Sequence, residues 1–167
     1  EIRCAWQSNH NYCFTTTALT SKIWWIYEDE NGEWQAKPVA DIGDASKIPL
    51  PVDISISSDD QLLWVDTWHD GKTRVFDISV PEKAFQIYEK KIGNQINMLS
   101  QSWDGKRVYF TSSLLDNWDM REGDEGDLQY FKAYNWNGSS LEHKFSIDFI
   151  KEKLGSPHQM RFGSHSL

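Results

Sequence analysis

The sequence lacks the features that mark membrane proteins, disulfide-rich proteins and nucleic-acid-binding proteins. Its 167 residues include only two cysteines, too few for a disulfide framework and without the C-x-x-C spacing of a metal site. No apolar run reaches the ~18 residues that span a bilayer, and the first residues lack a signal-peptide pattern. There are 17 basic and 25 acidic residues, a net charge of -8, and no Lys/Arg cluster. We therefore expect neither a nucleic acid nor a membrane as a partner.

The sequence also lacks the short motifs of three enzyme classes. It contains no G-x-S-x-G elbow, no G-x-x-x-x-G-K-[ST] loop and no H-E-x-x-H pair, which argues against a serine hydrolase, a nucleotide-binding enzyme and a zinc protease. An acidic stretch from Asp116 to Asp127 does not follow the spacing of a calcium loop, so a solvated face is the favoured interpretation.

The two cysteines, Cys4 and Cys13, lie on segments that we expect to be adjacent strands. They could pair across a hairpin or stay reduced in a core. The reduced form is favoured, because two cysteines make no framework and show no metal spacing. Both arrangements stay open on the sequence alone.

Aromatic residues and turn signals dominate what the sequence does contain. It is 39% hydrophobic and 14% aromatic, which is ample material for a core. The stretch 96–119 predicts a hairpin that turns at Asp104-Gly105. A similar stretch, from Asp53 to Trp68, lies roughly 45 residues earlier, a period typical of repeat architectures. The sequence therefore contains an internal repeat.

The repeat predicts an all-β fold with three four-stranded units. Turn signals at Asn31-Gly32 and Asn137-Gly138 mark equivalent positions in the first and third units. Four strands in a period of roughly 45 to 50 residues are typical of β-propeller blades, and a β-sandwich is the alternative. We predict blades at residues 1–46, 47–95 and 96–150, followed by a C-terminal tail at 151–167.

Three blades would leave open sheet edges, because a closed propeller typically needs about four to eight. The sequence also begins without an initiator methionine. We therefore expect the chain to be part of a larger propeller.

Several motifs, in this order and spacing, resemble the selenium-binding protein and methanethiol oxidase family over nearly the whole chain. They are Glu1-Ile2-Arg3, the Ile23 to Trp34 stretch ending in G-x-W, Asp53-Ile54-x-Ile56-Ser57-x-Asp59-Asp60, Arg74 to Ser79, Asp104 to Leu114, Asp148-Phe149, and Pro157-His158-Gln159-x-Arg161.

The resemblance implies a seven-bladed-type propeller whose C-terminal part is this chain, so the N-terminal half of the same propeller would be required. For bacterial members it implies a copper-dependent oxidase that converts methanethiol, oxygen and water to formaldehyde, hydrogen sulfide and hydrogen peroxide. Such an enzyme would be periplasmic in bacteria, and other members would be cytoplasmic. The alternative is a non-enzymatic propeller that binds a selenium species, a metal or a protein partner.

Candidate metal ligands follow from the same resemblance. His158, in the P-H-Q-x-R motif, is the one copper ligand that carries over to this chain. His165 could join the ion if the tail folds back, and His69 could face a channel mouth, although a frayed terminus and a solvated turn are the favoured interpretations. Arg161 is expected to have a structural role. No catalytic base can be named.

Two departures from the family pattern bear on function. Trp6 stands where family members commonly have a histidine soon after E-I-R, and the tail continues as Phe162-Gly163-Ser164-His165 in place of the common Gly-Gly-Asp and Ser-Ser-Asp ending. Loss of further copper ligands would favour the non-enzymatic alternative. The selenium-associated cysteine of the family falls outside this chain, so neither Cys4 nor Cys13 is expected to take its role.

Overall fold

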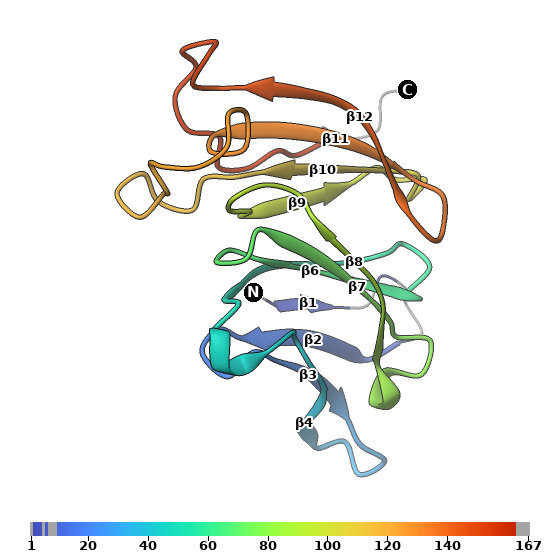
Figure 1. Ribbon diagram of the computed structural model, residues 1–167. Coiled ribbons are helices and arrows are strands. Elements are labelled where there is room, and N and C mark those ends of the chain that lie inside the picture. The colour runs from blue at the N-terminus through green and yellow to red at the C-terminus, as the bar shows by residue number, and fades with distance from the viewer. Residues whose placement is uncertain (1, 5, 7–9, 163–167) are drawn as a thin grey trace.

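Three antiparallel sheets of four strands are stacked in the computed structural model, which describes residues 2–4, 6 and 10–162 (Figure 1). The first sheet contains β1 (Ile2–Cys4), β2 (Tyr12–Thr17), β3 (Lys22–Glu28) and β4 (Trp34–Asp41). The second contains β5 (Pro51–Ile56), β6 (Leu62–Thr67), β7 (Lys72–Asp77) and β8 (Phe85–Lys91). The third contains β9 (Met98–Gln101), β10 (Arg107–Thr111), β11 (Tyr130–Trp136) and β12 (Leu141–Asp148). Each sheet follows chain order, as the internal repeat predicted.

The repeat is visible in the hydrogen bonds of two equivalent turns. Ser57 Oγ donates to Asp59 Oδ1 at 2.5 Å, and Ser102 Oγ donates to Asp104 Oδ1 at the same distance. The next residues, Asp60 and Gly105, both adopt a left-handed backbone, with φ of 57° and 66°. Glycine takes this conformation without strain, whereas a non-glycine residue needs compensating contacts.

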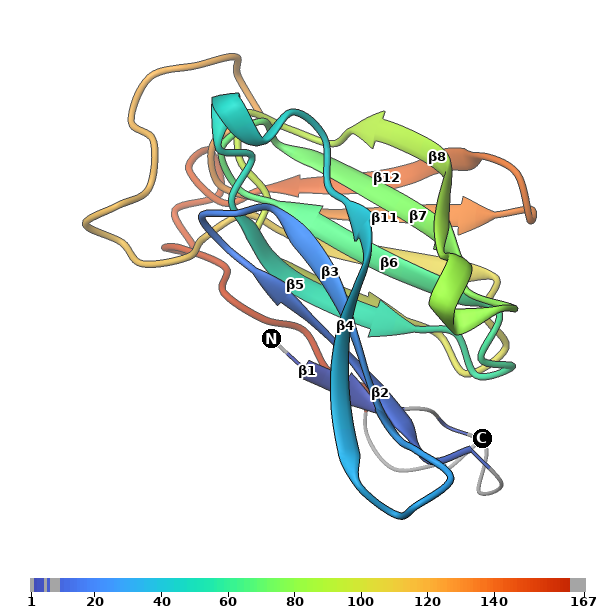
Figure 2. The same ribbon diagram turned by 90° about the horizontal axis from the view of Figure 1, so that it is seen from below.

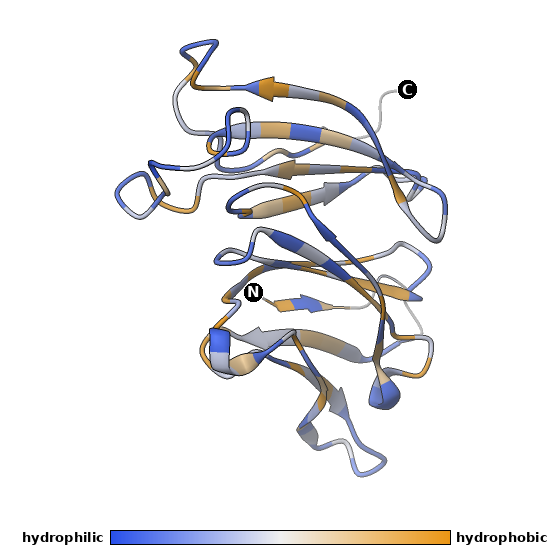
Figure 3. Ribbon diagram, viewed as in Figure 1, coloured by the Kyte–Doolittle hydropathy of each residue, from blue (hydrophilic) through white to orange (hydrophobic). Residues whose placement is uncertain are grey.

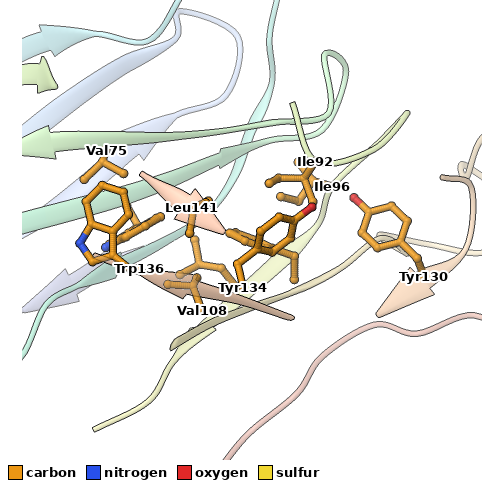
Figure 4. Close-up of a cluster of buried hydrophobic side chains, with 11 residues drawn as sticks. Val75, Ile92, Ile96, Val108, Tyr130, Tyr134, Trp136 and Leu141 are labelled. Atoms are coloured by element: carbon orange, nitrogen blue, oxygen red, sulfur yellow. The ribbon is translucent and has the colours of Figure 1, made fainter. Parts of the chain in front are cut away.

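Two hydrophobic layers separate the three sheets. Strand residues point alternately to the two faces of a sheet, so Leu63 and Val65 of β6 pack toward the first sheet while Trp64 packs toward the third. Trp64 meets Trp136 with their ring centroids 4.9 Å apart, and Figure 4 shows Trp136 beside Val75 in this layer. In Figure 3, hydrophobic segments lie largely on the strands and hydrophilic ones on the connecting loops.

The first strands of the three sheets lie next to one another. β5 is in contact with both β1 and β9, whereas β4, β8 and β12 form the opposite edges of their sheets. We call the β1, β5 and β9 side the inner edge and the β4, β8 and β12 side the outer edge. Figure 2 views the same stack from below. None of the helices in the described part of the chain is long and apolar enough to cross a membrane.

The structure corrects two expectations. Cys4 and Cys13 form a disulfide, because the β1–β2 register places them directly opposite each other with Cα atoms 3.8 Å apart. The favoured reduced form was therefore wrong. In the acidic loop, Asp119 is buried and accepts hydrogen bonds from Leu114 N at 3.0 Å and Gln129 Nε2 at 2.8 Å. That carboxylate organises the loop and is not part of a solvated face.

Candidate functional site

The tail after β12 is held along the inner end of the third sheet. Ser113 N donates to Pro157 O at 3.0 Å, Thr111 Oγ1 donates to His158 O at 2.7 Å, and Ser100 Oγ donates to Met160 O at 2.5 Å. These bonds come from β9, β10 and the residues that follow β10. They fix the backbone of residues 157–160, so the positions from which the side chains of the P-H-Q-x-R motif project are defined.

The ring of His158 is oriented through one nitrogen. His158 Nδ1 lies 2.9 Å from Ser113 O, a carbonyl that can only accept, and 3.1 Å from Asn97 Nδ2, an amide nitrogen that can only donate. Because the contact with the carbonyl is the shorter one, we assign the proton to Nδ1. Asn97 is fully buried, and its Nδ2 donates to Ser113 O at 2.6 Å and to His158 O at 3.3 Å. This tautomer leaves Nε2 with a lone pair on an exposed imidazole. Metal-bound histidines are commonly oriented through a carbonyl in this way.

The structure does not bring His69 to His158. His69 is exposed, its Nδ1 lies 2.7 Å from Ile48 O, and it borders a different cavity with Asp70 and Glu89. His165 lies outside the described residues. Within the described ranges, no group of three or more His, Cys, Asp or Glu residues could hold a metal ion. The described residues thus provide one oriented metal ligand, His158, and not a complete metal site.

Asp53 is a buried carboxylate that joins all three inner strands. Its Oδ1 lies 3.3 Å from Arg3 Nη2 of β1, and its Oδ2 accepts Leu99 N of β9 at 2.9 Å. Oδ1 also accepts Ile54 N at 2.9 Å. Sequence reasoning missed this role, although a single acid in the buried D-I-S-I strand was a signal that could have prompted it.

Asp66 is the second buried acid of this region, on β6 opposite Asp53 in the strand register. Burial and the neighbouring Asp53 raise the pKa of Asp66 well above 3.8, and the nearby Thr73 and Arg74 lower it only in part. Asp66 therefore keeps its proton to a higher pH than an ordinary carboxyl group does. In the protonated form, the two acids lie side by side without strong repulsion.

A cavity of about 430 Å³ opens where the inner strands meet the tail. Arg3 and Trp6 line it from the first sheet, Trp103 from the third, and Gln159 and Arg161 from the tail. In the tail, the lining of the cavity starts at Gln159, the residue after His158, and His158 itself does not line it. We call it the inner-edge pocket. Arg161, expected to have a structural role, makes no ion pair with any described residue and faces this cavity.

Comparison with known proteins identifies the family. Residues 1–165 match the family model described as "56kDa selenium binding protein (SBP56)". The chain belongs to the selenium-binding protein family. Among curated members, it is 64% identical over 167 residues to a methanethiol oxidase of Ruegeria pomeroyi and 56% identical over 164 residues to one of Hyphomicrobium sp.. These alignments cover 100% and 98% of this chain, but only 38% and 37% of the relatives.

Solved structures agree with this membership and with the fold. A hypothetical selenium-binding protein from Sulfolobus tokodaii matches with a TM-score of 0.75 and 30% identity, covering 89% of this selenium-binding-family chain and 41% of that one. A β-propeller domain from Myceliophteria thermophila matches with a TM-score of 0.52 and 12% identity, covering 86% and 58% of the two chains, a likeness of fold alone. The three sheets are therefore propeller blades.

Proposed function

We propose that the protein is a copper-dependent methanethiol oxidase in which this chain supplies three blades and the copper ligand His158. The reaction would convert methanethiol, oxygen and water to formaldehyde, hydrogen sulfide and hydrogen peroxide. The printed names of the two relatives, at 64% and 56% identity, support this activity. Because the chain spans less than two fifths of those relatives, the proposal concerns a protein that also contains the remaining blades.

The observation that carries the proposal is the orientation of the His158 ring. Its Nδ1 is held by Ser113 O at 2.9 Å, so Nε2 is the nitrogen that would hold the ion. Imidazole nitrogen suits copper, and a fixed ring orientation favours ligation over rotation into solvent. Copper, when bound, would accept electrons from the thiol and pass them to oxygen. The chain's own contribution is to orient one ligand and to hold the tail against the third blade.

Asn97 would act as a positioning residue for this ligand. Its Nδ2 donates both to Ser113 O, the acceptor of the His158 ring, and to His158 O. Such partners of metal ligands typically contribute about 10- to 100-fold to metal affinity. Further copper ligands would come from the blades that lie outside this chain.

The alternative is a non-enzymatic propeller that binds a selenium species or a metal. Trp6, at the position where a histidine is common in the family, has its Nε1 bonded to Ile56 O at 2.9 Å and its backbone N bonded to Asp60 Oδ1 at 2.7 Å. A tryptophan held in this way offers no metal ligand. The names of the relatives and the oriented His158 nevertheless favour the oxidase.

Oxygen uptake with methanethiol tests the proposed activity. We expect the full-length, copper-loaded protein to consume oxygen and to release hydrogen sulfide and hydrogen peroxide in equal amounts. His158→Ala should lose at least about 100-fold of the rate, because an uncompensated metal ligand is lost. His143→Ala is the matched control, since His143 on β12 bonds Ser146 Oγ at the outer edge. No oxygen uptake by the loaded wild type would overturn the oxidase proposal.

A further inference from the structure

We propose that the inner-edge pocket binds a small organic anion, a compound with a planar apolar body and one carboxylate or sulfonate group. His158 does not line this pocket, and the proposal does not rest on the proposed oxidase activity. Its volume of about 430 Å³ lies in the range of small-molecule sites. A one-carbon thiol would leave most of that space unused.

The charge of the pocket is opposite to that of the chain. The sequence has 25 acidic and 17 basic residues, yet the charged side chains that line the pocket in the described part of the chain are Arg3 and Arg161, with no acid among them. Arg3 shares its charge with Asp53 at 3.3 Å. Arg161 has no such partner among the described residues. The pocket therefore carries a local positive charge in a protein of net charge -8.

The arginines that line two other cavities differ from Arg161 in their surroundings. Arg74 lies 2.5 Å from Asp70 and 2.9 Å from Glu89 in the cavity beside His69. Arg121 lies 3.3 Å from Asp116 at a cavity below the acidic loop. Those guanidinium groups already have anionic partners, so a ligand anion would gain little there. No described residue gives Arg161 an anionic partner, so a ligand carboxylate could accept two parallel N–H bonds from it.

The aromatic walls of the pocket explain why the ligand would have a planar apolar body. Trp6 follows β1 of the first sheet, and Trp103 lies in the turn between β9 and β10 of the third sheet. Their rings meet edge to face, with centroids 5.7 Å apart. Their exposed fractions are 54% and 47%, so large indole surfaces face the open space. On the tail side, Phe162 packs against Tyr109 at 5.3 Å. Aromatic surface of this kind packs well against a flat ring.

Two polar side chains of β9 that line the pocket already form hydrogen bonds within the protein. We therefore expect the tail to bind the anion. Gln101 Nε2 donates to Ser55 Oγ at 2.8 Å, and Ser100 Oγ donates to Met160 O at 2.5 Å. Arg161 directly follows Met160, whose carbonyl the Ser100 bond holds to β9. Specificity would therefore come from the guanidinium group of Arg161 together with the indole rings of Trp6 and Trp103.

Calorimetric titration of the full-length protein with benzoate tests this site. We expect a Kd below about 1 mM. Benzamide, the uncharged isostere, should bind at least about tenfold more weakly, and Arg161→Gln should raise the Kd for benzoate at least about tenfold, because charge-assisted bonds are lost. Lys151→Gln is the matched control: it removes the same charge from an exposed tail residue outside the pocket and should change the Kd less than about twofold.

Three results would overturn the proposal. They are no heat with benzoate up to about 10 mM, equal binding of benzoate and benzamide, and an equal loss of affinity in Arg161→Gln and Lys151→Gln. Trp103→Leu provides a second variant that keeps both arginines and should also weaken benzoate. The titration is run on copper-free and copper-loaded protein. Because His158 does not line the pocket, benzoate should bind both forms even if no oxidase activity is found.

Discussion

The inner and outer edges of the three blades are held together by different interactions. At the inner edge, buried side chains bond between sheets: Asp53 alone contacts Arg3 of the first sheet and Leu99 of the third. At the outer edge, ion pairs face solvent, both within one sheet, as in Lys22–Asp41 of β3 and β4, and between blades, as in Lys37–Glu82. The comparison teaches that polar residues of the inner edge assemble the blades and place the tail, whereas those of the outer edge mainly solvate the protein.

Tryptophan substitutions give the largest expected contrast between an interior layer and the outer edge. Trp64 is fully buried between the second and third sheets, and Trp34 on β4 is 57% exposed. Trp64→Ala should lower the free energy of unfolding by about 3–5 kcal/mol, because it leaves a large cavity. Trp34→Ala should change it by less than about 0.5 kcal/mol. Urea unfolding followed by circular dichroism measures both, and equal losses would refute the contrast.

Removal of an acid from each edge should give the next largest difference. Asp53→Ala leaves Leu99 N and Ile54 N without their acceptor, so we expect a loss of about 2–4 kcal/mol in the free energy of unfolding. Asp41→Ala removes only an exposed partner of Lys22 and should cost less than about 1 kcal/mol. The same unfolding experiment decides between them. A loss in Asp53→Ala no larger than that in Asp41→Ala would show that Asp53 does not join the sheets.

The disulfide of β1 tests whether the inner edge of the first blade depends on a covalent link. The Cys4→Ala/Cys13→Ala double variant should be about 2–3 kcal/mol less stable, because the unfolded chain gains the freedom of an open loop. A reducing agent should lower the stability of the wild type by a similar amount and leave the double variant unchanged. Two free thiols after alkylation of the unreduced, denatured protein would contradict the link.

The smallest expected effect is a pH dependence that comes from Asp66. The pKa of this buried acid is raised well above 3.8, so between 3.8 and the raised value the folded protein binds more protons than the unfolded chain. Its contribution to stability is therefore fully present at low pH and declines as the pH rises through that window. Asp66→Asn mimics the neutral acid and should remove this decline. We would measure the free energy of unfolding of the wild type and of Asp66→Asn at several pH values. The two curves of stability against pH should diverge, and parallel curves would argue against the raised pKa.

Much of the fold could be predicted from the sequence because its signals are local. Turn residues such as Asp104-Gly105 and a repeated Ser-x-Asp pattern place the hairpins. Strand register is less local. The register decides whether Cys4 lies opposite Cys13, and the turn residues do not determine the register.

The candidate site could be predicted only in part. The resemblance pointed to His158, but its orientation depends on Ser113 O, a carbonyl in a different segment of the chain. The meeting of Trp6 with Trp103 depends on how the first and third sheets are stacked. Contacts between sheets follow from the packing of whole blades, which hydrophobic periodicity does not specify.

Copper content per protein, measured by elemental analysis, tests the central claim that the inner edge orients a metal ligand through His158. Full-length wild type, His158→Ala and the outer-edge control His143→Ala should be loaded and purified side by side. We predict near-stoichiometric copper in the wild type and in His143→Ala, and a loss of most copper in His158→Ala. Copper that stays bound in His158→Ala, or no copper in the loaded wild type, would contradict the claim.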